Sequence, residues 1–432
     1  MKGTKKKYVL DCSAIIYMAL LQGKMSNVFR LSLTLKETVD PAVLQEAVNN
    51  LTPRFPTVLA GIHDGAFQYF VVPVSEPPLV QEEKKPLLYM PRKEVKKCGT
   101  RILYKDNMVA VEFFHAITDG RGATYFLKAL IAEYVRLKYG VEVTEKDEII
   151  TPKTAVSDAE TEDSFLSYAG KTKQAYFSSS SYRFKSKKRG DSISFITGTF
   201  DTDTIIKTAH KYGATVTTFL SAVMLESIMD IQIRTKKPRQ KSKPVHLMIP
   251  IDLRRQFPSV SLRNFALQAY LTLDPDDVEM PFENLMSSVE GQLRRQFAFE
   301  PLSAIITQTA HLQKGVQYLP LFIKSTTVRI VLNFVEENTS ALFFSNLGLF
   351  TLPDSIKEYV TGVDFALTPR NSSPYNCGVV SYGDKLRINL TKCGEGVGLE
   401  RLFFEKLHKF GCIPELEVDG EAVSMPEFLG WR

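Results

Sequence analysis

The sequence contains few cysteines, and their spacing argues against two common uses of this residue. The five cysteines are Cys12, Cys98, Cys377, Cys393 and Cys412. Their number is odd and no C-x-x-C pair occurs, so neither a disulfide framework nor a zinc site is indicated. Reduced thiols in a cytoplasm fit this pattern best. We therefore expect a cytoplasmic protein without a bound metal ion.

The chain also lacks a strong excess of charge of either sign. Its net charge is +6, with 54 lysines and arginines against 48 acidic residues. The basic residues are spread along the chain and no nucleic-acid-binding motif occurs. No nucleic-acid partner is expected.

Long apolar runs are missing as well. No stretch of the sequence reaches the length that a membrane-spanning helix needs. The basic residues 1–7 precede an apolar run that Asp11 interrupts, and no signal-peptide cleavage site follows. The sequence therefore predicts neither a transmembrane segment nor a secretory leader.

What remains is the composition of a globular protein large enough for two domains. The chain has 432 residues, of which 44% are hydrophobic and 24% charged, and these are ordinary values for a globular protein. Residues 151–190 are rich in polar and charged side chains, which is typical of a linker. We expect domains at residues 1–150 and 191–432, joined by this linker.

One short stretch, from His115 to Gly120, joins a predicted strand to a predicted helix. Residues 108–114 form an apolar run, and residues 121–138 repeat apolar side chains at three- and four-residue spacing. Because alternate strand residues share a face, His115 ends an apolar face of the strand. Burial there favours the neutral imidazole, which can act as a general base.

The other residues of this stretch have more than one interpretation. Asp119 either caps the helix by accepting hydrogen bonds from its first amides or pairs with a cation and so holds the turn in shape. Gly120 and Gly122 give the turn backbone freedom. A plainer interpretation also stands, in which His115 is a buried core residue beside a helix cap.

The pattern H-x-x-x-D-G after a hydrophobic strand resembles the motif of one acyltransferase superfamily. This superfamily includes chloramphenicol acetyltransferase, peptide-synthetase condensation domains, plant BAHD acyltransferases and alcohol acetyltransferases. Further segments occur in the family's order, namely the opening of the chain, the segment at Arg254 and the run Ser345-Asn346-Leu347-Gly348. Phe114 stands where condensation domains usually carry a second histidine, and the D-F-G-W-G motif of the plant enzymes is absent. Both departures favour the alcohol-acetyltransferase branch.

The resemblance implies an α/β fold of two chloramphenicol-acetyltransferase-like subdomains, with the active site in a tunnel between them. It implies acetyl- or acyl-coenzyme A as co-substrate and an alcohol or amine as acceptor, deprotonated by His115. Asp119 and Gly120 belong to the motif, and Arg254 would pair with Asp119 across the two halves. Ser345 or Asn346 would stabilise the oxyanion of a tetrahedral intermediate.

Two alternatives to this function stay open. In the first, the acyl group comes from a carrier-protein thioester; in the second, the chain is a non-catalytic binding module of the same fold. The basic residues at 234, 236, 237, 239, 241 and 243 form a solvated loop, contact coenzyme A phosphates, or dock an acidic carrier.

Overall fold

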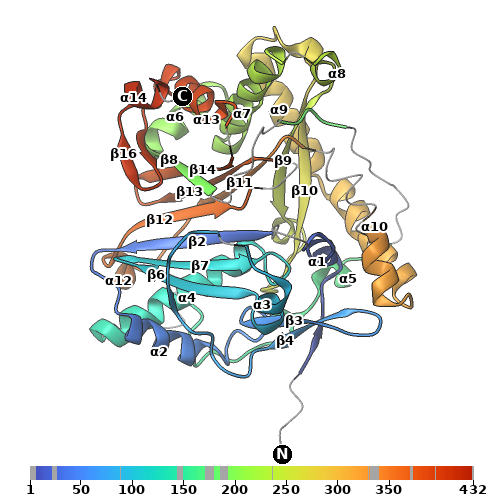
Figure 1. The fold of residues 1–432 in the computed structure, drawn as a ribbon, viewed down its shortest axis with the longest axis vertical. Coiled ribbons are helices and arrows are strands. Elements are labelled where there is room, and N and C mark those ends of the chain that lie inside the picture. Colours follow the sequence, from blue (N-terminus) through green and yellow to red (C-terminus); the bar gives the residue numbers. More distant parts are fainter. Residues whose placement is uncertain are drawn as a thin grey trace, which may run out of the picture.

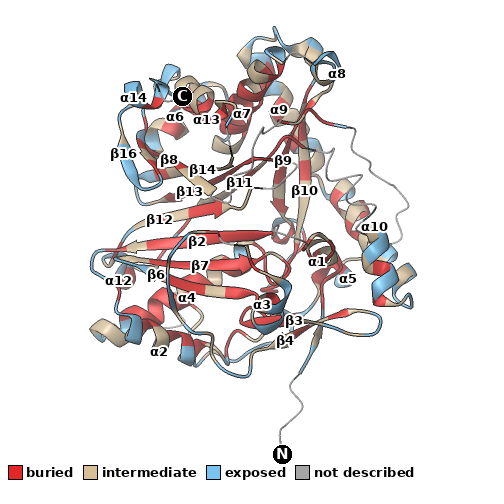
Figure 2. Ribbon diagram, in the orientation of Figure 1, coloured by how far each residue is buried: buried red, intermediate tan, exposed pale blue. Residues whose placement is uncertain are grey.

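Two large β-sheets, each covered by helices, form the two halves of the structure, which is a computed structural model (Figure 1). The structure describes residues 6–21, 27–87, 89–143, 149–170, 180–184, 193–235, 237–328, 330, 340–369, 373–394 and 396–430. Figure 2 shows that the central strands of both sheets are buried. The core is therefore divided between the two halves.

The sheet of the first half has five strands in the order β12-β2-β7-β6-β5. Its strands from this half are β2 (Val28–Leu35), β5 (Gln81–Glu82), β6 (Thr100–Lys105) and β7 (Met108–Phe114). Strands β6 and β7 form a hairpin, with Lys105 opposite Met108. Helices α2 (Pro41–Leu51) and α4 (Gly120–Tyr139) lie together on one side of the sheet (Figure 1). Asp40 caps α2 by accepting from the amides of Ala42 and Val43, and Pro41 follows it in the first turn, where its missing N–H costs no hydrogen bond.

A small sheet and several short helices lie beside this half. The sheet has the order β1-β4-β3, with β1 (Tyr8–Val9), β3 (Ala60–Asp64) and β4 (Tyr69–Pro73). The helical segments are η1 (Cys12–Ala14), α1 (Ile15–Leu20) and α3 (Arg92–Lys97).

The sheet of the second half has eight strands in the order β10-β9-β11-β13-β14-β8-β15-β16. The strands are β8 (Ile193–Asp201), β9 (Val245–Asp252), β10 (Ala266–Leu273), β11 (Leu342–Leu349), β13 (Tyr375–Tyr382), β14 (Lys385–Cys393), β15 (Glu415–Val418) and β16 (Glu421–Val423). Strand β11 runs parallel to both of its neighbours, and the other pairs of this sheet are antiparallel.

Helices pack against this sheet and complete the hydrophobic core of the second half. They are α6 (Thr202–Lys211), α7 (Val216–Ile233), α8 (Pro238–Lys241), η4 (Leu253–Arg255), η5 (Pro275–Asp277), α9 (Phe282–Gln296), α10 (Phe299–Val316), α13 (Leu399–Lys409) and α14 (Met425–Gly430). The short helix α12 (Asp354–Lys357) instead packs against α4 and β12 of the first half (Figure 1). Asp201 and Thr215 cap α6 and α7 by accepting from the amides of Thr204 and Thr218.

Helix α7 corrects the expectation that no segment is long and apolar enough to span a membrane. It has 18 residues with a mean hydropathy of 1.4, and it meets that criterion by length and composition. However, 72% of the helix is buried inside the fold. A helix that is apolar on all sides and enclosed by protein is typical of a globular core.

Strand β12 (Val360–Leu367) comes from the second half of the sequence but belongs to the sheet of the first half. It pairs antiparallel with β2, in a register that runs from Val360 opposite Leu35 to Leu367 opposite Phe29. The predicted boundary between residues 1–150 and 191–432 therefore does not separate the two sheets, because the second segment supplies an edge strand to the first sheet.

The described part of the predicted linker packs between the halves. It contains η3 (Ala159–Thr161) and α5 (Ser164–Ser167). Phe165 is fully buried and meets the ring of Phe265 edge-on at 5.3 Å, while Glu160 forms an ion pair of 2.7 Å with Arg54. These residues are part of the packed structure. Residues 171–179 and 185–190 of the predicted linker lie outside the described residues.

The contact between the halves leaves no room for a side chain at residue 122. A Cβ on Gly122 would lie 2.2 Å from the carbonyl oxygen of Leu262 and 2.2 Å from Oγ1 of Thr118. Gly122 has no left-handed backbone angle, so this glycine serves close approach, which corrects the expectation of backbone freedom in the turn.

We predict that Gly122→Ala lowers the free energy of unfolding by about 1–3 kcal/mol, because the methyl group forces the packed backbone apart. Gly315→Ala in α10 is the matched control, since a Cβ there meets nothing within 4 Å; its helix should gain roughly 0.5–1 kcal/mol or stay unchanged. Urea unfolding of both variants measures the difference. Equal stability of the two would contradict this packing.

Candidate active site

The turn between β7 and α4 is fixed by one carboxylate oxygen of Asp119. Asp119 is the N-cap of α4, and its Oδ1 accepts hydrogen bonds from the amides of Arg121 (3.1 Å) and Gly122 (3.0 Å). These are two of the amides that a helix start leaves without a partner inside the helix. The predicted helix is confirmed, and the cap explains where it begins.

The second carboxylate oxygen of Asp119 joins the two halves. Oδ2 accepts from Nη1 of Arg254 at 2.7 Å and from the amide of Phe265 at 2.8 Å. Both charged side chains are buried, with 3% and 4% of their side-chain surface exposed. The pairing of Asp119 with Arg254 is therefore present in the structure, and the two interpretations of Asp119, cap and ion pair, hold at the same time.

Arg254 is saturated with hydrogen bonds. Its guanidinium also donates to the carbonyl oxygens of Ser261 and Arg263 and to Oδ1 of Asp252. Burial lowers the pKa of Arg254, but the charge of Asp119 and its hydrogen bond outweigh this, so the pKa lies above its ordinary value. The guanidinium therefore stays charged, and its ion pair with Asp119 stabilises the turn between β7 and α4.

His115 lies at the end of β7 with its ring held on both sides. The ring stacks on Tyr17 at 4.5 Å between centroids, and it lies 4.9 Å from the ring of Phe29. Its Nδ1 is 3.2 Å from the amide oxygen of Asn264. With the amide oxygen of Asn264 directed at the ring, Nδ1 carries the ring proton and Nε2 is the basic nitrogen.

Asn264 was not among the residues predicted for the site. Asn264 is buried, and the residues on both sides of it contact the first half. Arg263 forms an ion pair of 2.8 Å with Asp11, and the amide of Phe265 donates to Asp119. The sequence carries no periodic signal for Asn264, because it faces His115 across 149 positions of the chain.

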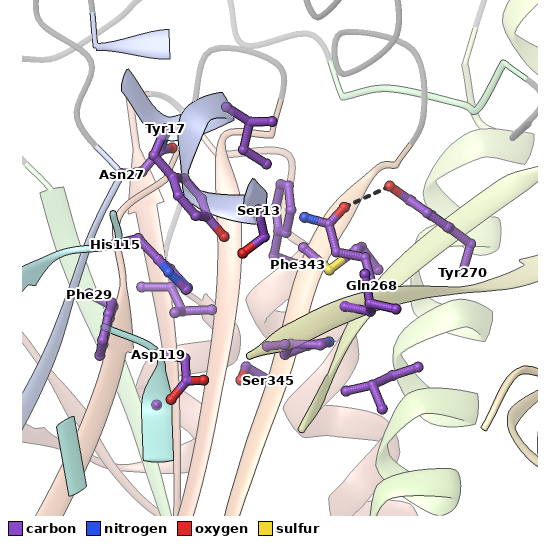
Figure 3. Close-up of a pocket in the computed structure, with 18 of the residues that line it drawn as sticks. Ser13, Tyr17, Asn27, Phe29, His115, Asp119, Gln268, Tyr270, Phe343 and Ser345 are labelled. Carbon is purple, nitrogen blue, oxygen red and sulfur yellow. Dashed lines mark hydrogen bonds between the residues drawn. The ribbon is translucent and has the colours of Figure 1, made fainter. Parts of the chain in front are cut away.

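A cavity of about 670 Å³ opens at His115 and is lined from both halves. Figure 3 shows His115, Tyr17 and Phe29 on one side, and Gln268, Tyr270 and Phe343 on another. The volume lies in the range of sites that bind small molecules. The predicted position of the site, between the two halves, agrees with this cavity.

Of the two residues predicted to stabilise an oxyanion, only Ser345 lines the cavity. Alternate residues of β11 point to opposite faces. The side chain of Asn346 donates to Oγ1 of Thr217 at 3.1 Å and accepts from the amide of Gly348 at 2.8 Å. Asn346 is thus committed to other contacts, and Ser345 is the candidate donor toward the cavity.

Gly120 also lines the cavity, next to β11. A Cβ at this position would lie 2.8 Å from Cδ2 of Leu347. Its backbone is not left-handed, so here too the glycine permits a close contact and corrects the expectation of backbone freedom.

Other features of the sequence add no reactive group to the cavity. Burial raises the pKa of Cys12, which lines the cavity, so the thiol stays protonated and is a poor nucleophile. None of the described residues between 234 and 243 lines the cavity, and α8 lies at the outer end of the second half (Figure 1). Across the described ranges, no group of three or more His, Cys, Asp or Glu side chains could hold a metal ion.

Comparison of the fold with solved structures gives full-length matches. TRI101 of F. sporotrichioides, solved with coenzyme A and T-2, has a TM-score of 0.65 at 13% identity and covers 96% of this chain and 100% of its own. Polyketide synthase associated protein 5 of Mycobacterium tuberculosis has a TM-score of 0.58 at 12% identity, covering 94% and 97%. The starter condensation domain of rhizomide synthetase, solved with C8-CoA, has a TM-score of 0.56 at 15% identity, covering 95% and 96%.

The chain shares their fold. The predicted two-part fold of the chloramphenicol acetyltransferase and condensation-domain type is thereby confirmed. No family model matches the chain, and no curated protein matches its sequence. At identities of 12–15% the likeness concerns the fold, and the chemistry of the site depends on the residues described above.

We predict that Arg254→Met lowers the free energy of unfolding by about 3–5 kcal/mol, because it leaves the buried carboxylate of Asp119 without its cation. Arg255→Met is the matched control. Arg255 is the exposed neighbour, and its loss should change stability by no more than about 0.5 kcal/mol. Thermal and urea unfolding compare the two, and a stable Arg254→Met protein would show that the pair is dispensable.

Proposed function

We propose that this protein is an acyltransferase that moves an acetyl or other acyl group from coenzyme A to an alcohol or amine, with His115 as the general base. One observation carries the proposal: a histidine whose Nδ1 faces the amide oxygen of Asn264, which makes Nε2 the basic nitrogen, borders a cavity formed by both halves. Such a nitrogen suits proton removal from a bound hydroxyl.

The proposed reaction has a single tetrahedral intermediate and no acyl-enzyme. Nε2 of His115 takes the proton of the acceptor hydroxyl while its oxygen attacks the thioester carbonyl. The hydroxyl of Ser345 donates to the resulting oxyanion. The carbon–sulfur bond then breaks, and the departing thiolate takes the proton from the imidazolium. Asp119 transfers no proton in this scheme; with Arg254 it holds the turn that carries His115.

Coenzyme A as donor is supported by what the similar structures hold. TRI101 of F. sporotrichioides was solved with coenzyme A, TRI101 of F. graminearum with ethyl coenzyme A, and the condensation domain with C8-CoA. An alcohol acceptor is supported by TRI3 of Fusarium sporotrichioides, described as a trichothecene 15-O-acetyltransferase. We extend the general reaction, acyl transfer to a hydroxyl group, to this chain.

A carrier-protein donor is the second candidate, because a condensation domain and a polyketide synthase associated protein share the fold. Acetyl-coenzyme A and an acetyl-loaded carrier protein, offered separately to the purified enzyme with the same alcohols, distinguish the two donors. Turnover from the carrier alone would replace coenzyme A in the proposal.

We predict that His115→Ala lowers kcat/KM for coenzyme A release by roughly 10²–10⁴-fold, because the base is lost. The melting temperature should stay close to that of the wild type. His408→Ala, at an exposed histidine of α13, is the control and should keep full activity. Full activity of the His115→Ala protein would end the proposal, and binding of coenzyme A without turnover of any thioester would favour the non-catalytic module.

Ser345→Ala tests the oxyanion donor separately. We expect kcat to fall by about 10²-fold with little change in KM, because the hydrogen bond strengthens only in the transition state. Asn346→Ala serves as the comparison and should change kcat much less, since that side chain bonds to Thr217. The reverse order of the two effects would move the oxyanion site to Asn346.

A further inference from the structure

A tyrosine–glutamine pair forms part of the cavity wall away from His115. Gln268 and Tyr270 stand two residues apart on β10, so they share one face of the strand. Both line the cavity, and the Tyr270 hydroxyl donates to Oε1 of Gln268 at 2.9 Å (Figure 3). The pair lies across the cavity from His115 in the same view.

This hydrogen bond fixes the orientation of the Gln268 amide. With Oε1 accepting from Tyr270, the amide nitrogen is turned away from the tyrosine. Among the residues that the structure describes, Nε2 of Gln268 has no hydrogen-bond partner. This nitrogen is also not among the polar atoms that are buried without a partner. Two N–H donors are therefore available at the cavity wall, where a ligand oxygen could accept from them.

The neighbouring amide, Gln296, shows the contrast. It also lines the cavity, but its Nε2 donates to the Tyr270 carbonyl at 2.8 Å and its Oε1 accepts from the Tyr270 amide at 2.9 Å. Gln296 thus pins the backbone of β10 at Tyr270. The amide oxygen and nitrogen of Gln296 both bond to the backbone of β10 and so support the strand. In Gln268 only the amide oxygen is bonded, and the nitrogen is available to a ligand.

The other residues of the cavity wall indicate what kind of molecule would supply the oxygen that accepts from Gln268. Of the described residues that line the cavity, none is a lysine or arginine, and the only carboxylate is Asp119, whose two oxygens are both occupied. A charged group of the acceptor, placed inside the cavity, would therefore lose its hydration without gaining a counter-ion. Much of the remaining wall is apolar and includes Met248, Ile251, Leu267, Leu302, Ile305 and Phe343.

We infer that Gln268, oriented by Tyr270, recognises a second oxygen of the acceptor. The acceptor is a neutral, mainly apolar alcohol that carries a carbonyl, ether or hydroxyl oxygen remote from the reacting hydroxyl. This inference rests on the proposed function. A saturated acyl chain offers no oxygen beyond its thioester carbonyl. The pantetheine arm of coenzyme A does carry amide oxygens, and the KM of acetyl-coenzyme A in the Gln268→Leu variant separates that ligand from the acceptor. When Gln268 binds one oxygen of the acceptor, one particular hydroxyl group lies next to His115. The Gln268–Tyr270 pair therefore determines which hydroxyl of the acceptor is acylated.

The test uses matched alcohols with acetyl-coenzyme A as the common donor. Primary alcohols of roughly six to twelve carbon atoms are each compared with the alcohol of equal length that carries a terminal methyl ketone, which covers the spans available in a cavity of this size. We expect the wild type to prefer the best ketone over its plain partner by about 10-fold in kcat/KM, the effect of one hydrogen bond. The preference should appear in KM.

Gln268→Leu should abolish this preference, so that each ketone reacts no faster than its plain partner of equal length. Tyr270→Phe should reduce it, because the amide loses its orientation. Gln308→Leu, which removes another amide from the cavity wall, is the control and should keep the preference. Equal preference in the wild type and Gln268→Leu would overturn the inference, and so would an effect of Gln268→Leu on the KM of acetyl-coenzyme A in place of the alcohol.

Binding without turnover separates this inference from the proposed function. The shift in melting temperature caused by each alcohol is measured for the wild type and Gln268→Leu. A larger shift with the ketone in the wild type only would support recognition by Gln268 even if no thioester reacts. No difference between the members of any pair, together with normal coenzyme A release, would refute the recognition site and leave the transferase in place.

Discussion

The structure depends on the buried ion pair between Asp119 and Arg254. Two charges removed from water are tolerated only when their hydrogen-bonding capacity is satisfied. Here the carboxylate accepts from two helix amides, one strand-end amide and the guanidinium, while the guanidinium also donates to two carbonyl oxygens and Asp252. Asp119 belongs to the first half and Arg254 to the second, so the pair fixes the relative position of the two walls of the cavity.

The same contacts place His115, the proposed base. The segment 263–265 clamps Asp119 through the amide of Phe265 and, one residue earlier, presents the Asn264 side chain to Nδ1 of His115. Arg263 anchors this segment by its ion pair with Asp11 and by a hydrogen bond to the carbonyl oxygen of Thr161. The tautomer of His115 is therefore linked to the packing between the halves. The proposed general-base chemistry therefore depends on contacts that never touch the reacting atoms.

Local sequence patterns predicted the elements that local forces determine. The strand before His115, the helix after it and the cap at Asp119 follow from apolar spacing and from a side chain that satisfies free amides. The pairing of Asp119 with Arg254 came from the family resemblance, because no local rule joins residues 135 positions apart. Local rules also presented the cap and the ion pair as alternatives, although a carboxylate has two oxygens and Asp119 uses one for each.

Long-range packing explains what the sequence could not predict. The transfer of β12 to the other sheet, the burial of Phe165 in a polar segment and the contact of Asn264 with His115 depend on partners more than 90 residues away. Ser345 and Asn346 were indistinguishable in sequence, since only the direction in which each side chain leaves β11 separates them. Gln268 and Tyr270 carry no motif at all, and their relation appears only when β10 borders the cavity.

The most direct test of the central claim, that the Asp119–Arg254 pair holds His115 in its working position, is a double-mutant cycle on kcat/KM for coenzyme A release. The cycle compares Asp119→Ala, Arg254→Met and the double variant. We expect the double variant to lose little more than the worse single variant, which corresponds to a coupling energy of about 2–3 kcal/mol for residues in direct contact. If the free-energy losses of the two single variants sum to that of the double variant within roughly 0.5 kcal/mol, the two residues act independently, and this result would contradict the claim.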